Sequence, residues 1–189
     1  MPVAAARTIT FTPEEYFDWE ERQEERHEYS RGEVYPTPGG TYEHFLIVSN
    51  VVGTLRLALG DAGAVLPDGM RVQIHELRYV YPDTSVVLGE PAFREGSKRR
   101  VLLNPSVVVE VLSESTATYD RGETFALYRE VASLREIVWV DSERRFVEVA
   151  TKSDGTWALP SPVEDGRVEL PSLGVTVAVD DLYRGVTLG

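Results

Sequence analysis

Hydrophobic positions follow two different periods along this chain, and each period predicts a kind of element. Over 42–59 the apolar side chains recur every three to four residues, which predicts a helix, and a Thr-Pro-Glu-Glu start predicts a shorter helix over 13–23. Valine-rich runs at 79–88 and 105–113, bounded by proline or Asn-Pro, are typical of buried strands. Helices interspersed among strands predict an α/β or α+β fold with a mixed sheet.

Turn residues and caps predict the remaining elements. Glycine-containing turns predict β-hairpins around Gly32 and at 153–155. One strand is expected over 65–74, and a capping-box pattern predicts a third helix over 120–131. The polar stretch 89–104 is expected to be a long connection.

Length and composition are those of an ordinary globular protein. The chain has 189 residues, 42% of them hydrophobic and 26% charged, so a single domain over 1–189 is expected. Cysteine is absent, which excludes disulfides, thiolate metal ligands and cysteine nucleophiles and agrees with a cytoplasmic location. No run approaches about 18 consecutive apolar residues, so we expect no membrane-spanning segment.

The net charge of −12 argues against tight binding of a polyanion. Sequence-independent affinity for nucleic acid comes from lysine and arginine side chains that neutralise phosphates. Local basic clusters exist at 98–100 and 144–145, although such clusters are more often solvated loop charges. Any DNA contact is therefore expected to be weak or local.

Each of the two valine-rich runs contains one carboxylate, Asp83 in the first and Glu110 in the second. An ionised acid within a buried strand loses several kcal/mol of hydration, in order of magnitude, unless a partner compensates for it. A divalent cation shared by acids on neighbouring strands is one such partner. The two residues therefore form a candidate metal-dependent active site.

A purely structural explanation of the two acids stays open on the residues alone. Asp83 follows a proline and could bond backbone N–H groups or pair with an arginine. Glu110 is harder to explain in this way, because its neighbours over 107–112 are otherwise apolar. The alternatives are a two-carboxylate metal site and a structural ion pair.

The order of short motifs along the chain resembles that of the Uma2 family (DUF820), a branch of the PD-(D/E)XK nuclease superfamily. The resemblance covers nearly the whole chain, and the ordered set is more specific than any one motif. The matching residues are 12–16, 26–29, 32–35, His44, 81–83, 109–113, 115–116, 119–122, 128–129, 171–174 and 182–183.

This resemblance implies a restriction endonuclease-like core, a mixed central β-sheet flanked by helices, with additional β-hairpins. It also implies Mg²⁺-dependent hydrolysis of DNA phosphodiester bonds, with Mn²⁺ as a substitute ion. Asp83 and Glu110 would hold the metal, and the backbone carbonyl of Val111 would be a third ligand. A homodimer is expected by the same analogy, because a two-fold pair is the simplest way to cut both strands.

One departure from the superfamily pattern concerns a catalytic lysine. The superfamily places it two residues after the strand glutamate, where this chain has Leu112, and the family often supplies it from the next helix, where this chain has Thr124. Arg121 is then the nearest cation. Either Arg121 substitutes for the lysine, or the protein is a catalytically weak or inactive nuclease-fold module for binding or assembly.

Two further residues are candidates for the site. Glu28, in the expected hairpin, could be an accessory acid near the metal. His44 could be a base or phosphate contact, although a histidine near a helix start is more often a cap or hydrogen-bond partner. A glycoside hydrolase with two carboxylates is a third reading, but no aromatic cluster suited to sugar binding lies near either acid in the sequence.

Overall fold

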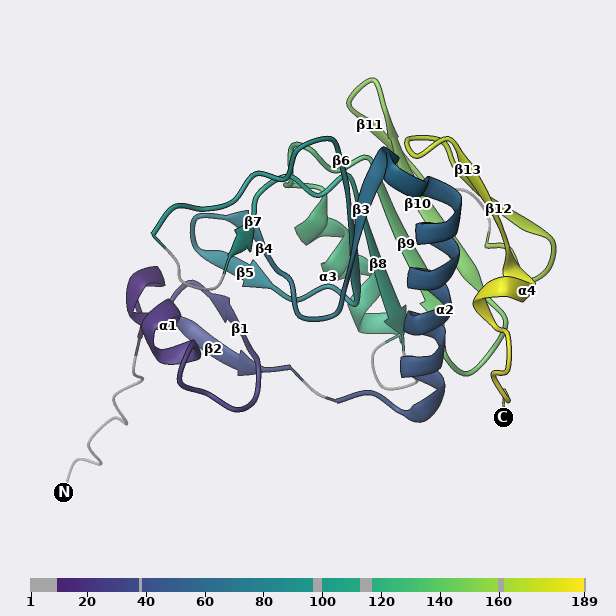
Figure 1. The fold of residues 1–189 in the computed structure, drawn as a ribbon. Helices are drawn as coiled ribbons and strands as arrows, with labels where there is room; N and C mark the ends of the chain where they lie inside the picture. The colour runs from purple at the N-terminus through teal and green to yellow at the C-terminus, as the bar shows by residue number, and fades with distance from the viewer. Residues whose placement is uncertain (1–9, 38, 97–99, 113–116, 160–161, 189) are drawn as a thin grey trace.

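The computed structural model describes residues 10–37, 39–96, 100–112, 117–159 and 162–188, without the side chains of 117–121 (Figure 1). Its helices are separated by runs of short strands. In chain order they are α1 (Pro13–Glu20), β1 (His27–Ser30), β2 (Glu33–Pro36), α2 (Tyr42–Leu59), the 3₁₀ helix η1 (Gly60–Ala62), β3 (Gly63–Pro67), β4 (Arg71–His75), β5 (Arg78–Val80), β6 (Thr84–Leu88), β7 (Val101–Leu102), β8 (Val107–Leu112), α3 (Ala117–Tyr128), β9 (Glu136–Asp141), β10 (Val147–Ser153), β11 (Thr156–Ala158), β12 (Arg167–Leu170), β13 (Val175–Ala178) and α4 (Val179–Leu182).

The central sheet has six strands in the order β11-β10-β9-β8-β6-β3. Strands β8 and β9 are parallel, and the other described neighbours in this sheet are antiparallel. A second sheet, in the order β2-β1-β5-β4-β7, also mixes directions because β4 and β7 are parallel. Strands β12 and β13 pair as a hairpin. The expected α+β fold with a mixed central sheet and additional hairpins is confirmed.

Helices α2 and α3 lie on opposite faces of the central sheet (Figure 1). Successive side chains of a strand point to opposite faces. Accordingly Val109 and Val111 of β8 pack in the cluster that includes α2, whereas Val108 and Leu112 pack in the cluster that includes Tyr128 of α3. Glu110 shares the alternation of Val108 and Leu112 and therefore points toward α3.

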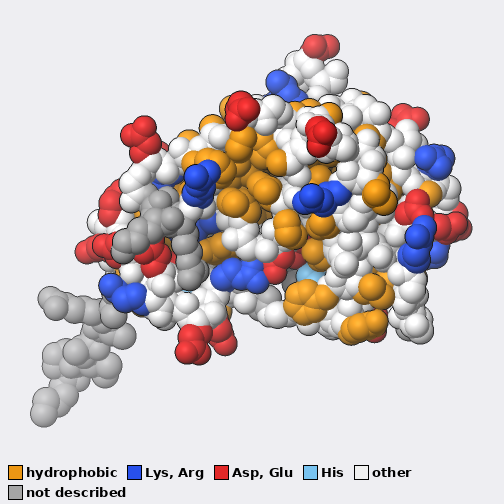
Figure 2. Space-filling model, viewed as in Figure 1, with side chains coloured by type: hydrophobic (Ala, Val, Ile, Leu, Met, Phe, Trp, Pro, Cys, Tyr) orange, Lys and Arg blue, Asp and Glu red, His pale blue; other side chains and the backbone are white. Residues whose placement is uncertain are grey.

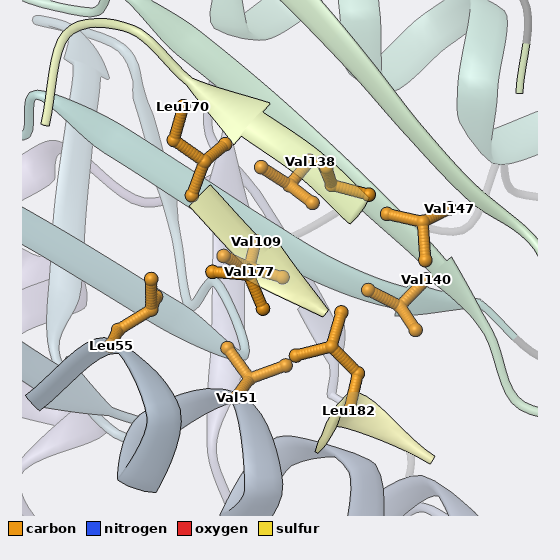
Figure 3. Close-up of a pocket in the computed structure, with 10 residues that line it drawn as sticks. Val51, Leu55, Val109, Val138, Val140, Val147, Leu170, Val177 and Leu182 are labelled. Carbon is orange, nitrogen blue, oxygen red and sulfur yellow. The ribbon is translucent and has the colours of Figure 1, made fainter. Parts of the chain in front are cut away.

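A small apolar cavity lies between α2, the central sheet and the β12–β13 hairpin (Figure 3). Its volume is about 20 Å³, and valine and leucine side chains such as Val51, Val109 and Val177 point into it. A cavity of this size holds about one water, and an apolar lining disfavours even that. The cavity is thus a packing defect of the core.

The second sheet packs against α1 through a separate aromatic cluster, in which Tyr16 stacks on Tyr29 with ring centroids 5.0 Å apart. Beside it lies a buried polar group of Glu20, Arg71 and Tyr81. The Arg71 Nε donates to the Tyr81 hydroxyl at 2.8 Å, and that hydroxyl donates to Glu20 at 3.0 Å. These bonds satisfy charges that would otherwise be costly to bury.

Several predicted boundaries are wrong. The single strand expected over 65–74 is two strands, β3 and β4, in different sheets. The run 79–88 is likewise split into β5 and β6, and the stretch 89–104 contains the short strand β7. Helix α1 ends at Glu20, and α3 spans Ala117–Tyr128 rather than 120–131.

Helix α2 with η1 is long and apolar enough to cross a membrane by length and composition alone. The sequence carries no uninterrupted apolar run of that length, since Glu43, His44 and Arg56 lie within the helix. One face of α2, including Ile47 and Val51, is buried in the core cluster of the central sheet. The helix therefore packs against the central sheet through one face.

Candidate active site

The two predicted carboxylates lie beside each other at one end of the central sheet. Strands β6 and β8 are antiparallel with Thr84 opposite Val109, so continuing the register by one residue places Asp83 opposite Glu110. The Val111 N–H donates to Asp83 Oδ2 at 2.7 Å. We call Asp83 and Glu110 the carboxylate pair.

Glu110 accepts a hydrogen bond from the hydroxyl of Tyr128, which comes from the last turn of α3. Tyr128 is only 2% exposed. Burial, and then the negative charge of Asp83, raise the pKa of Glu110 well above its ordinary value, whereas the Tyr128 hydrogen bond lowers it. A partly buried, hydrogen-bonded acid next to a second acid is typical of functional sites.

His44 brings the start of α2 to the carboxylate pair. Its Nε2 lies 3.1 Å from Asp83 Oδ1, while its backbone N–H donates to the capping hydroxyl of Thr41 at 3.3 Å. Burial lowers the pKa of His44, but the hydrogen bond and charge of Asp83, together with the Val111 carbonyl, outweigh it and raise the pKa. His44 is thus both part of the helix start and a partner of the site.

Glu28, the predicted accessory acid, also lies near the pair. Its carboxylate accepts a hydrogen bond from Arg78 Nη2 at 2.9 Å, between strands β1 and β5. The charge of Glu28 contributes to the raised pKa of Glu110 and of Tyr128. The structure therefore brings Asp83, Glu110, His44 and Glu28 together at one place.

Arg26, which belongs to the matching motif 26–29 but was assigned no role from the sequence, lies at the edge of this group. Arg26 forms a two-pronged pair with Asp68, with Nη2 2.7 Å from Oδ2, and its guanidinium lies 5.8 Å from the centre of the Tyr81 ring. The hydrogen bonds of Asp68 chiefly raise the pKa of Arg26, and the charge of Asp83 adds to this. Figure 2 shows basic, acidic and histidine side chains meeting on one face, with apolar side chains beside them.

Helix α3 contains both residues discussed for the missing lysine. Thr124 is partly buried and lies one turn before Tyr128, so by helical spacing it points to the same side as the hydroxyl that contacts Glu110. Arg121 lies in the same helix, two turns before Tyr128, and its side chain is outside the described residues. Leu112, at the superfamily's other lysine position, is buried in the core.

The sequence analysis did not assign roles to Tyr128, Arg26 and Asp68. A signal existed for Tyr128, because a tyrosine on the buried face of a helix needs a partner for its hydroxyl. No local signal existed for the Arg26–Asp68 pair, whose members are 42 residues apart in the chain.

The carboxylate pair fits a hard divalent cation. Two neighbouring acids, one with a raised pKa, lack an ion-paired arginine or lysine within the described part of the chain. In that same part, no cluster of three or more histidine or acidic side chains is arranged to hold a metal. The donors would therefore be two carboxylates, a backbone oxygen and water, which is the kind of set that Mg²⁺ accepts.

The mixed central sheet, the flanking helices and the adjacent carboxylates define a nuclease-like α+β protein. The fold is shared with the crystal structure of a "putative nuclease belonging to DUF820" from Anabaena variabilis, with a TM-score of 0.73 at 17% identity over 92% of this chain and 97% of that one.

In sequence, the Uma2 family, described as "Putative restriction endonuclease", matches residues 13–180, and the chain belongs to this family. Two proteins of Synechocystis sp. are similar. They are slr1290, 37% identical over 93% of this chain and 92% of its own, and sll1609, 34% identical over 83% and 90%. Membership of this family supports a nuclease that uses a divalent metal ion, without specifying the ion or the substrate.

Proposed function

We propose that this protein is a Mg²⁺-dependent endonuclease that hydrolyses phosphodiester bonds of DNA. The observation that carries the proposal is the carboxylate pair, placed side by side on adjacent strands at one end of the sheet. Burial and the charge of Asp83 disfavour ionisation of Glu110, and a bound cation would compensate for both negative charges.

Five residues have distinct roles in this proposal. Asp83 and Glu110 hold the metal, with the Val111 carbonyl as a third ligand. His44 and the Val111 N–H bond the two oxygens of Asp83, which fixes that carboxylate while leaving it further lone pairs. Tyr128 fixes Glu110 in the same way. A divalent ion bound here supplies an activated water and stabilises negative charge on the phosphate.

Calorimetric titration with Mn²⁺ tests this proposal without knowledge of the substrate, since Mn²⁺ suits the same oxygen ligands as Mg²⁺. We expect binding to the wild type and none to the Asp83→Asn/Glu110→Gln variant. A matched control is Asp61→Asn/Glu169→Gln, which removes two exposed carboxylates and should bind Mn²⁺ like the wild type. With Mg²⁺ and DNA, cleavage should likewise be lost only in the Asp83/Glu110 variant.

The free energy of unfolding without metal separates this proposal from a structural ion pair. Removing two neighbouring carboxylates that repel each other should leave the stability unchanged or raise it. A loss of about 3 kcal/mol or more, the usual result of breaking a buried ion pair, would support the structural reading instead. Absence of Mn²⁺ binding in the wild type would favour the non-catalytic module. The homodimer and the cytoplasmic location stay predictions.

A further inference from the structure

Two exposed aromatic side chains lie at the start of α2, the helix that brings His44 to the candidate active site. Tyr42 and Phe45, at the start of α2, are 74% and 50% exposed. They are three residues apart on a helix, so their Cβ atoms lie about 5–6 Å from each other. Among the described residues three tyrosine or phenylalanine side chains are exposed. They are Tyr42, Phe45 and Tyr35 of β2. We call Tyr42 and Phe45 the aromatic pair.

The aromatic pair is continuous with the carboxylate pair through His44. The Phe45 ring meets the His44 imidazole edge-to-face at 5.3 Å between centroids, and that imidazole is 3.1 Å from Asp83. The Phe45 ring is thus separated by one side chain, His44, from the Asp83 carboxylate that is proposed to bind the metal. Figure 2 shows apolar side chains directly beside the histidine on this face.

The charge of the molecule restricts what these rings can bind. A duplex is held mainly by phosphate contacts to lysine and arginine, and this chain has a net charge of −12. In the described part of the site, Arg26 and Arg78 are already paired with Asp68 and Glu28. Stacking of unpaired bases on aromatic rings adds about 1–3 kcal/mol per base to whatever phosphate contacts are made, and only unpaired bases offer it.

From these observations we propose that the aromatic pair is a stacking platform for unpaired bases, and that the substrate enters the site as single-stranded DNA. This inference rests on the proposed nuclease function and specifies its substrate. It also predicts a weak dependence of binding on salt, because few phosphates are neutralised and each contributes a slope of only about 0.7 in log affinity against log salt.

Fluorescence anisotropy in EDTA, where no cleavage occurs, tests this proposal with three labelled probes of equal length: a single strand, its duplex, and an abasic strand with the same phosphates. We expect the single strand to bind about tenfold or more tighter than the other two. Tyr42→Ala/Phe45→Ala should lower the affinity for the single strand by about tenfold or more and leave the abasic strand unaffected.

Three single substitutions separate stacking from general apolar contact. Tyr42→Phe keeps a flat ring and should retain the affinity for the single strand, whereas Tyr42→Leu should lose it. Leu57→Ala is the matched control, since Leu57 is 88% exposed on the same helix but about 18 Å further along it than Phe45. It should bind DNA like the wild type.

Equal binding of the single, duplex and abasic probes would overturn the proposal, as would an unchanged affinity in Tyr42→Ala/Phe45→Ala or no DNA binding at all. Loss of self-association in that variant, measured by sedimentation, with DNA binding unchanged, would show a protein interface instead. The Mn²⁺ titration reports on the nuclease function separately. Intact Mn²⁺ binding with failed stacking would refute only this inference, whereas absent Mn²⁺ binding in the wild type would refute the function.

Discussion

The Tyr128 hydroxyl donates a hydrogen bond to Glu110, and among the described residues it has no other hydrogen-bond partner. The phenol is buried, so it cannot exchange this hydrogen bond for one with water without opening the core. Groups that orient a metal ligand from behind usually matter nearly as much as the ligand itself. Tyr128 thus differs from an aromatic residue that only packs in the core, because its hydroxyl orients Glu110.

Tyr128→Phe should weaken Mn²⁺ binding by about tenfold to a hundredfold, because the Glu110 carboxylate loses the bond that orients it. Calorimetric titration measures the affinity. Tyr183→Phe is a matched control, since Tyr183 is also buried but its hydroxyl bonds the backbone of Phe146 and Asp141. That variant should bind Mn²⁺ normally and lose about 1–3 kcal/mol of stability, because the Phe146 N–H loses its acceptor. Equal Mn²⁺ affinity in Tyr128→Phe and the wild type would show that Tyr128 only packs.

At the scale of single residues, the sequence indicated site residues where a charged side chain interrupts an apolar run, because burying that charge costs free energy. Asp83 and Glu110 could be identified because each carboxylate interrupts a valine-rich run. His44 gave a weaker signal, since a histidine near a helix start is often a cap; in the structure Thr41 is the cap and the His44 imidazole contacts Asp83. The partners of these residues could not be identified in this way, because their roles depend on contacts across the fold.

At the scale of elements, α3 determines which groups face the carboxylate pair from behind. Thr124 and Tyr128 are one turn apart, and Tyr128 contacts Glu110. A long cationic side chain at position 124 would therefore project toward the same side of the helix. The lysine expected for the superfamily fits this face better than it fits position 112, which is buried among apolar side chains.

Thr124→Lys should raise the rate of Mg²⁺-dependent DNA cleavage, by about tenfold or more, because an added positive charge stabilises the charge that develops on the phosphate. Single-turnover cleavage assays measure the rate. Thr124→Met, which has similar length and no charge, should leave it unchanged. A rate in Thr124→Lys equal to that of Thr124→Met would show that position 124 does not supply the missing charge.

Elements specified by nearby residues were predicted better than those specified by distant partners. The capping box at Thr12, the extent of α2 and the hairpin turn at 153–155 are confirmed, since each depends on residues a few positions apart. The run 79–88 was wrongly treated as one strand. Its halves β5 and β6 pair in different sheets with strands distant in the chain, and no local pattern encodes that choice.

At the scale of the whole molecule, the buried acid Glu136 links the β12–β13 hairpin to the central sheet through hydrogen bonds. Glu136, at the start of β9, is fully buried and accepts hydrogen bonds from the N–H and hydroxyl of Ser172 at 2.8 and 2.7 Å. Ser172 belongs to the turn between β12 and β13. The motif 171–174, one of the family matches, thus has a structural role, because its Ser172 connects the β12–β13 sheet to the central sheet.

Burial raises the pKa of Glu136 above its ordinary value of 4.5, although the hydrogen bonds of Ser172 act against this. A raised pKa means that the folded state binds the proton more tightly than the unfolded state does. The contribution of Glu136 to stability is therefore full below the unfolded pKa and is lost as the pH rises through the folded pKa. Stability should fall over this interval because of Glu136.

Glu136→Gln keeps an acceptor for the Ser172 N–H and cannot ionise. The free energy of unfolding of Glu136→Gln, relative to that of the wild type, should increase by about 1 kcal/mol or more as the pH is raised from 4.5 to 8. Urea unfolding across this range measures the difference, and Glu169→Gln, an exposed acid on neighbouring β12, should show no such trend. If Glu136→Gln instead lost stability relative to the wild type with rising pH, the ionised carboxylate would be the better partner of Ser172. The hydrogen bonds would then outweigh burial at this junction of the two sheets.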